Sequence, residues 1–176
     1  MSRKAGSIPE ETRAKLMKSA VAEFSELGYE KASLRRICSR ADVTTGALYF
    51  FFQDKEALFE NILLPVTGQL LSLMENHYKM ELASPILEIT NDDSEDIRAG
   101  EQLLELFYKN QTVCNILLSN RDHPFVSHFF DQITELISRQ SVLLLNRIHI
   151  SVQQYRPYPR VCQSQPVHSP CAANVQ

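Results

Sequence analysis

Apolar side chains recur along most of the chain at the spacing of a helix with one buried face. The set Leu16, Ala20, Phe24 and Leu27 is typical, because residues three and four positions apart share one side of a helix. No segment shows the strict alternation of apolar and polar residues that marks a β-strand. The pattern therefore predicts an all-α protein, with helices near residues 8–27, 33–40, 44–51, 54–74, 97–107, 111–119 and 124–144.

Several residues are of the kinds that begin, end or bend helices. Ser33 and Asp54 precede apolar stripes and are favourable N-cap residues. Gly28 follows the first stripe and is expected to end that helix in the left-handed conformation. Pro65 and Gly68 are expected to interrupt the long helix that starts after Asp54 with a kink, since proline removes a backbone hydrogen bond and clashes with the preceding turn.

The composition changes abruptly after Ile150. Residues 151–176 contain no Leu, Ile, Met, Phe, Asp, Glu or Lys, and they hold four of the eight prolines. Such a segment buries too little apolar surface to offset the entropy lost on ordering. We therefore predict a headpiece over residues 1–53, a helical domain over 54–150 and a disordered tail over 151–176. One hypothesis is that this tail is translated out of the natural reading frame.

The distribution of charge favours the first third of the chain as the part that meets nucleic acid. The 176 residues carry a net charge of −3. Residues 1–60 contain ten Lys and Arg against nine Asp and Glu, whereas residues 61–150 contain six against twelve. The basic side chains needed against phosphate are therefore more available at the N-terminal end.

Two short predicted helices joined by a three-residue turn form the pattern of a helix-turn-helix motif. Asp42 lies in the turn, where Asp can accept a left-handed conformation. Ile37, Val43 and Leu48 are spaced to hold the two helices together. The second helix begins with small residues, so its leading end is slim enough for a DNA major groove about 12 Å wide.

Residues 12–60 resemble the N-terminal domain of the TetR/AcrR family of transcriptional regulators. The resemblance is carried by the run Gly28–Cys38 (GYEKASLRRIC), the run Ala41–Tyr49 (ADVTTGALY), Phe52, and Lys55–Leu58 (KEAL). Within these runs, Cys38 stands where Ala is common in the family, and Asp42 stands where Gly is common. Both departures are sterically mild.

The resemblance implies a DNA-binding surface. In the family, side chains and helix N-termini hold DNA phosphates. The matching positions in this chain are Ser33, Thr44, Tyr49 and Lys55. Thr45, Ala47 and Phe50 would face the groove, beside the slim Gly46. Arg35 and Arg36 would add attraction that does not depend on base sequence.

The resemblance also implies partners. It predicts a cytoplasmic homodimer that binds palindromic double-stranded operator DNA and is released by a small-molecule inducer, with no membrane association. An alternative is a helical interaction protein that keeps the headpiece but does not dimerise productively, because the family uses two long final helices and this chain offers one clear candidate.

One methionine and four aromatic residues of the second part are candidates for the inducer pocket or for ordinary core. They are Met74, Phe107, Tyr108, Phe125 and Phe129. The chain has no glycine-rich phosphate loop and no nucleophile elbow, so we expect no catalytic residues and no enzyme activity. The four cysteines form no C-x-x-C pair, and we expect neither a metal site nor a cofactor.

Overall fold

The computed structural model describes residues 7–85 and 93–154, and within these ranges every regular element is a helix. The helices are α1 (Ser7–Lys31), α2 (Leu34–Ala41), α3 (Thr45–Phe51), α4 (Lys55–Ala83), α6 (Ser94–Lys109), α7 (Gln111–Ser119) and α8 (Pro124–Gln154). The predicted all-α class is confirmed. The predicted tail lies almost wholly outside the described residues, but α8 continues past Ile150 to Gln154.

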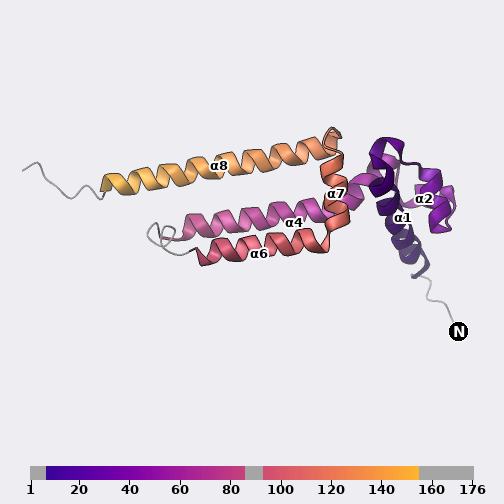
Figure 1. The fold of residues 1–176 in the computed structure, drawn as a ribbon, viewed down its shortest axis with the longest axis horizontal. Coiled ribbons are helices and arrows are strands. Elements are labelled where there is room, and N and C mark those ends of the chain that lie inside the picture. Colours follow the sequence, from indigo (N-terminus) through magenta and orange to yellow (C-terminus); the bar gives the residue numbers. More distant parts are fainter. Residues whose placement is uncertain (1–6, 86–92, 155–176) are drawn as a thin grey trace, which may run out of the picture.

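The helices form a headpiece at one end and a longer helical body at the other (Figure 1). Helices α1, α2 and α3 contact one another in the headpiece. Helix α4 leaves this headpiece and runs beside α6, while α7 lies across their end and contacts α1. Helix α8 returns along the body on its own and touches α4.

Local hydrogen bonds account for two of the helix starts. The Asp54 carboxylate accepts a hydrogen bond from the Ala57 backbone N–H at 2.7 Å, so its predicted N-cap role is confirmed. Thr44 caps α3 in the same way, since its hydroxyl accepts from Ala47 N–H at 3.2 Å. Ser33 occupies the N-cap position of α2, but its side chain makes no capping hydrogen bond.

Gly28 adopts the predicted left-handed conformation, with φ 73°, but the helix does not end there. The chain bends at Gly28 and resumes helical hydrogen bonding as far as Lys31. The reason is a contact with a distant residue. Asn120 lies just after α7, and its side-chain oxygen accepts a hydrogen bond from Tyr29 N–H at 2.9 Å. The N–H freed by the bend is therefore satisfied.

Pro65 and Gly68 do not end the fourth helix, because α4 runs through them to Ala83. The kink expected at Pro65 stays a prediction. A proline removes only one backbone hydrogen bond, and tertiary packing can outweigh that loss. Leu63, Val66 and Leu70 surround the site and are buried. Their stripe keeps the helix against the core on both sides of the proline.

One continuous core joins the headpiece to the body. The Phe59 ring of α4 lies 5.0 Å from the Phe24 ring of α1 and 4.9 Å from the Tyr29 ring, between centroids. His123 packs against the same cluster, 4.3 Å from the Tyr29 ring and 4.7 Å from the Phe59 ring. The proposed boundary between residues 53 and 54 stays a prediction, and buried contacts cross it.

Arg147 joins the far half of α8 to the end of α4. The Arg147 guanidinium donates to the carbonyls of Glu81 at 3.2 Å and Leu82 at 2.5 Å, and also to that of Ser84. These groups lie at the C-terminal end of α4, where backbone carbonyls lack helical partners. The apolar side chains around Arg147 stay exposed: Val142, Leu143, Leu145, Ile148 and Ile150.

Helix α4 is long and apolar enough, by length and composition alone, to cross a membrane. Its Leu58, Phe59 and Ile62 side chains are buried against the other helices. A core helix of a soluble protein passes the same test, so the property is weak evidence of membrane insertion.

Candidate nucleic-acid interface

The turn between α2 and α3 has the geometry that the sequence predicts. Asp42 is left-handed, with φ 54° and ψ 47°, and Val43 N–H donates to the Cys38 carbonyl at 3.0 Å. Ile37 and Leu48 are fully buried and hold the two helices on α1. Burial raises the pKa of the Cys38 thiol, which therefore stays protonated at neutral pH and serves as a small apolar side chain.

The leading end of α3 faces solvent. Thr44, Thr45 and Gly46 are exposed, and a side chain at Gly46 would meet no atom within 4 Å. Ala47 is half-buried, whereas Tyr49 is exposed and Phe50 is 79% exposed. Phe52, the next aromatic on the inner side, is buried. The surface predicted for the major groove therefore faces solvent over most of its area, although the Phe50 ring also lies 5.0 Å from the Phe51 ring.

Lys55 is held by the protein itself. Its ammonium donates to the carbonyls of Tyr29 at 2.9 Å and Glu30 at 3.3 Å, and it lies 4.4 Å from the centre of the Tyr29 ring. These bonds satisfy carbonyls at the C-terminal end of α1 and join that end to the start of α4. The structure thus gives Lys55 a structural task, and its contact with phosphate stays a prediction.

The basic residues of α2 divide into two kinds. Arg35 is exposed, whereas Arg36 and Arg40 pair with carboxylates of α1. Arg40 donates to both oxygens of Glu26, at 3.1 and 2.9 Å, and this bond lowers the pKa of the Glu26 carboxyl. The carboxylate therefore stays charged at neutral pH, and Arg40 is oriented along α1.

Glu23 was missed by the sequence analysis. Its side chain is fully buried, and its Oε1 atom lies 3.2 Å from Arg36 Nε and 3.1 Å from Ser33 N. A signal was available, because Glu23 falls three residues after Ala20 on the apolar stripe of α1. A charged residue at such a position needs a buried partner.

The residues predicted for an inducer pocket do not meet in one place. Phe107 and Phe129 line a cavity of about 290 Å³ together with residues of α4, α7 and α8. Met74 lines a separate hollow of about 280 Å³ between α4 and α6. Tyr108 is 89% exposed, and Phe125 is half-buried against the core. The sequence grouped these five residues by their helical spacing alone. Such spacing does not determine where helices cross, so it does not place the residues around one cavity.

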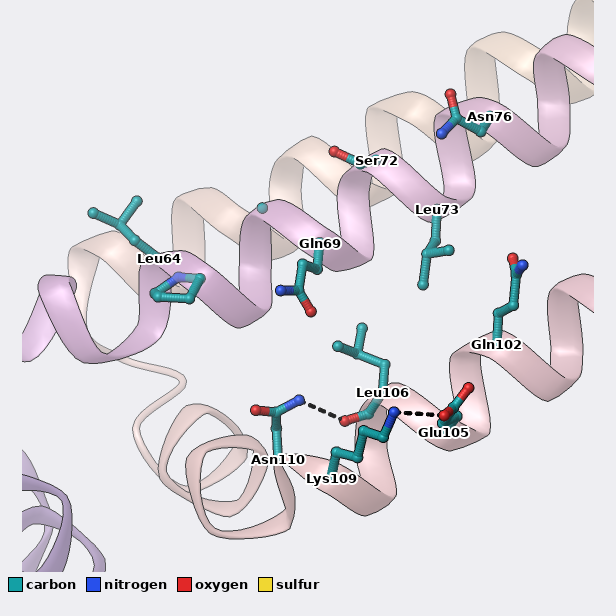
Figure 2. A pocket seen from close by; sticks show the side chains of 12 residues that line it. Leu64, Gln69, Ser72, Leu73, Asn76, Gln102, Glu105, Leu106, Lys109 and Asn110 are labelled. Atoms are coloured by element: carbon teal, nitrogen blue, oxygen red, sulfur yellow. Dashed lines mark hydrogen bonds and ion pairs between the residues drawn. The ribbon is translucent and has the colours of Figure 1, made fainter. Parts of the chain in front are cut away.

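A wider groove of about 690 Å³ lies between α4 and α6. Figure 2 shows Gln69 and Leu73 of α4 pointing toward Leu106 of α6. Its other walls combine three amide side chains and three apolar residues with Ser72 and the ion pair of Lys109 and Glu105 at 2.5 Å. Sequence reasoning missed this groove, since polar residues on helix surfaces carry no distinguishing pattern.

Known proteins resemble this chain most clearly in the headpiece. Residues 16–62 match the family described as bacterial regulatory proteins, tetR family. The headpiece is therefore similar to that of the TetR family, over residues 16–62. The TetR match covers α2 and α3 entirely, together with most of α1 and the start of α4.

Curated relatives agree over the same TetR segment. The A-factor receptor protein of Streptomyces griseus is 42% identical over 53 residues, which are 30% of this chain and 19% of that protein. The transcriptional regulator AcrR of Shigella flexneri is 40% identical over 62 residues, which are 35% of this chain and 29% of that protein. The matched segment thus spans less than a third of either relative.

A solved structure extends the similarity to the whole fold. A transcriptional regulator of the same family from Aquifex aeolicus superposes with a TM-score of 0.55. The aligned part covers 73% of this chain and 68% of that one, at 24% sequence identity. At this identity the likeness establishes the all-helical fold beyond the headpiece, and nothing about ligands.

Proposed function

We propose that this protein is a cytoplasmic, sequence-specific DNA-binding transcriptional repressor that works as a homodimer. The observation that carries the proposal is the exposed leading end of α3 on a buried frame, within a headpiece similar to that of the TetR family. Its small side chains and open Gly46 fit a helix that enters the major groove. No residue is assigned a catalytic role.

The exposed residues divide into base-reading and phosphate-binding groups. Thr45, Ala47 and Phe50 lie where base edges would be, and their methyl and ring groups suit contact with thymine methyls. Thr44 already caps α3, so the N-terminus of that helix is formed before a phosphate arrives. Tyr49, Ser33, Arg35 and Arg36 extend the phosphate-binding edge.

Dimerisation is assigned to the far half of α8. This half carries the exposed Val142, Leu143 and Leu145, which monomeric proteins rarely leave together in water. A second copy would cover them and place two headpieces on one side. Two headpieces on one duplex bind a palindrome, because each reads one half-site.

An inducer is assigned to the 290 Å³ cavity. Its walls include Leu70, Phe107, Leu117 and Phe129, and none of its lining residues is charged. A small neutral apolar molecule fits such walls, because a charge would lose hydration without finding a partner. Helix α7 contributes to the cavity and reaches the headpiece through Asn120, so a shift of α7 would change the pose of the headpiece.

Selection of bound sequences from random duplex DNA tests the repressor proposal. We expect the full chain to retain a palindromic sequence, with an affinity that falls steeply as salt rises. Sedimentation of the same sample should show a dimer. A well-folded chain that binds no duplex at low salt contradicts the proposal. A monomer that enriches no palindrome supports instead a helical interaction protein that keeps only the headpiece.

The inducer cavity is tested with indole, a neutral bicyclic aromatic. Indole should raise the melting temperature, because a ligand that binds only the folded state stabilises it by mass action. Leu118 lines the cavity but is exposed, so Leu118→Trp should fill the space and remove the shift without unfolding the chain. Leu104→Trp, at an exposed position of α6 that does not line the cavity, is the matched control and should keep the indole-induced rise in melting temperature. An equal shift in all three proteins contradicts the assignment.

A further inference from the structure

The joint between α1 and α2 contains a buried carboxylate whose short contacts involve only one of its two oxygens. Glu23 is 0% exposed, and its Oε2 atom has no hydrogen-bond partner among the described residues. The nearest cation to that oxygen is Arg40, whose terminal nitrogen is 4.0 Å away and is bonded to Glu26. Both short contacts of Glu23 therefore fall on Oε1.

Those two contacts bind the part of α2 that faces the predicted DNA. Oε1 accepts the backbone N–H of Ser33, the residue whose own side chain fails to cap α2. The same atom pairs with Arg36 through Nε at 3.2 Å. A single buried oxygen thus fixes the start of α2 and the direction of one of its arginines.

The pairing leaves the useful end of Arg36 free to face solvent. Nε carries one N–H group, and the remaining donors are on the two terminal nitrogens of the guanidinium. The Arg36 side chain is 56% exposed even though its Nε is paired. A guanidinium held by Nε presents its terminal fork outward, and that fork matches the oxygens of a phosphate.

We propose that Glu23 is a positioning residue for DNA binding, which holds Arg36 and the start of α2 in place for a phosphate of the DNA backbone. The role rests on the proposed function. Glu23 itself touches no DNA. Orienting the arginine before binding reduces the side-chain entropy lost when the phosphate contact forms.

Charge and position predict opposite results when Glu23 is changed, which makes the role testable. Removal of a negative charge from a DNA-facing domain should by itself strengthen binding to phosphate. Loss of the positioning contact should weaken it. Glu23→Gln removes the charge, whereas Glu23→Asp keeps the charge and withdraws the carboxylate by one methylene. Glu26→Gln, on the exposed partner of Arg40, is the control for charge alone.

Binding is measured on the random-sequence duplex pool over a range of salt concentrations, with melting temperatures taken for every variant. We expect Glu23→Asp and Glu23→Gln to weaken binding about five- to tenfold. Each should also lower the slope of log affinity against log salt by about 0.9, the value of one lost phosphate contact. Glu26→Gln should bind slightly more tightly than the wild-type chain.

The exposed arginine provides a second route to the same conclusion. Arg36→Met should fold, because the arginine is more than half exposed, and should lower the salt slope by the same amount. Glu23→Asp should weaken binding less when Arg36→Met is already present than it does alone, because the contact through Arg36 is then already lost and only the contact with Ser33 remains to be changed.

Several results would overturn the positioning role. An unchanged salt slope with a lower melting temperature would make Glu23 purely structural. If Glu23→Gln binds DNA more tightly than the wild type, as Glu26→Gln is expected to, then Glu23 affects binding only through its negative charge. An unchanged salt slope in Arg36→Met would remove the phosphate contact. If the wild-type chain binds no duplex, the proposed function itself is wrong, and the positioning role of Glu23 is wrong as well.

Discussion

Replacement of Phe59 by alanine should lower the free energy of unfolding by about 3–5 kcal/mol, which is a large share of the stability of a domain. The Phe59 side chain is fully buried, and its ring contacts Phe24, Tyr29 and His123. These partners come from α1, from the turn after Gly28 and from the residue just before α8. The cavity left by alanine would therefore open at the joint between headpiece and body.

Denaturant unfolding at fixed protein concentration measures this loss, because the stability of a dimer depends on concentration. Phe50→Ala is the matched control, since the same side chain is removed from the exposed surface of α3. It should change stability by no more than about 0.5 kcal/mol and should instead weaken DNA binding. Similar stability losses in the two variants would show that the Phe59 cluster is not the joint described here.

The headpiece could be predicted in detail because its signals are local. The left-handed Asp42, the capping Asp54 and the exposed Phe50 follow from conformational preference, short-range hydrogen bonds and helical spacing. Each of these depends on residues within a few positions in the sequence. The resemblance to a known family rests on the same residues, so both lines of reasoning describe one short region.

The rest depends on contacts between distant residues, which periodicity does not reveal. Gly28 was expected to end its helix, but Asn120, far along the chain, stabilises the bend and lets the helix resume. Lys55 is predicted to bind phosphate, but the sequence did not reveal that the carbonyls of Tyr29 and Glu30 hold its ammonium group. The five residues predicted for one pocket lie in separate places for the same reason, since helical spacing does not determine which helices cross.

These distant contacts also explain how the two ends of the molecule could communicate. The Tyr29 backbone N–H donates a hydrogen bond to the Asn120 side chain. Its ring lies under the Lys55 ammonium group and packs in a T-shaped arrangement with the His123 ring. A movement of α7 would therefore act on the bend at Gly28 rather than on the rigid frame of α2 and α3.

The oligomeric state should depend on Leu145. Leu145→Asp places a charge on the exposed apolar half of α8, where a second copy is proposed to pack. A buried, unpaired carboxylate is costly enough to dissociate the dimer. Two linked headpieces gain affinity over one by a factor of about 100 or more, so binding to the selected palindrome should fall by at least that factor.

Leu104→Asp separates this effect from a general change of charge. Leu104 is equally apolar and exposed, but it lies on α6, away from α8. It should leave both the sedimentation of the protein and its affinity for the palindrome within about twofold of the wild type. A Leu145→Asp chain that still sediments as a dimer would place the interface elsewhere. A monomeric variant that keeps full affinity would mean that one headpiece suffices, and the bare half of α8 would then need another explanation than operator binding.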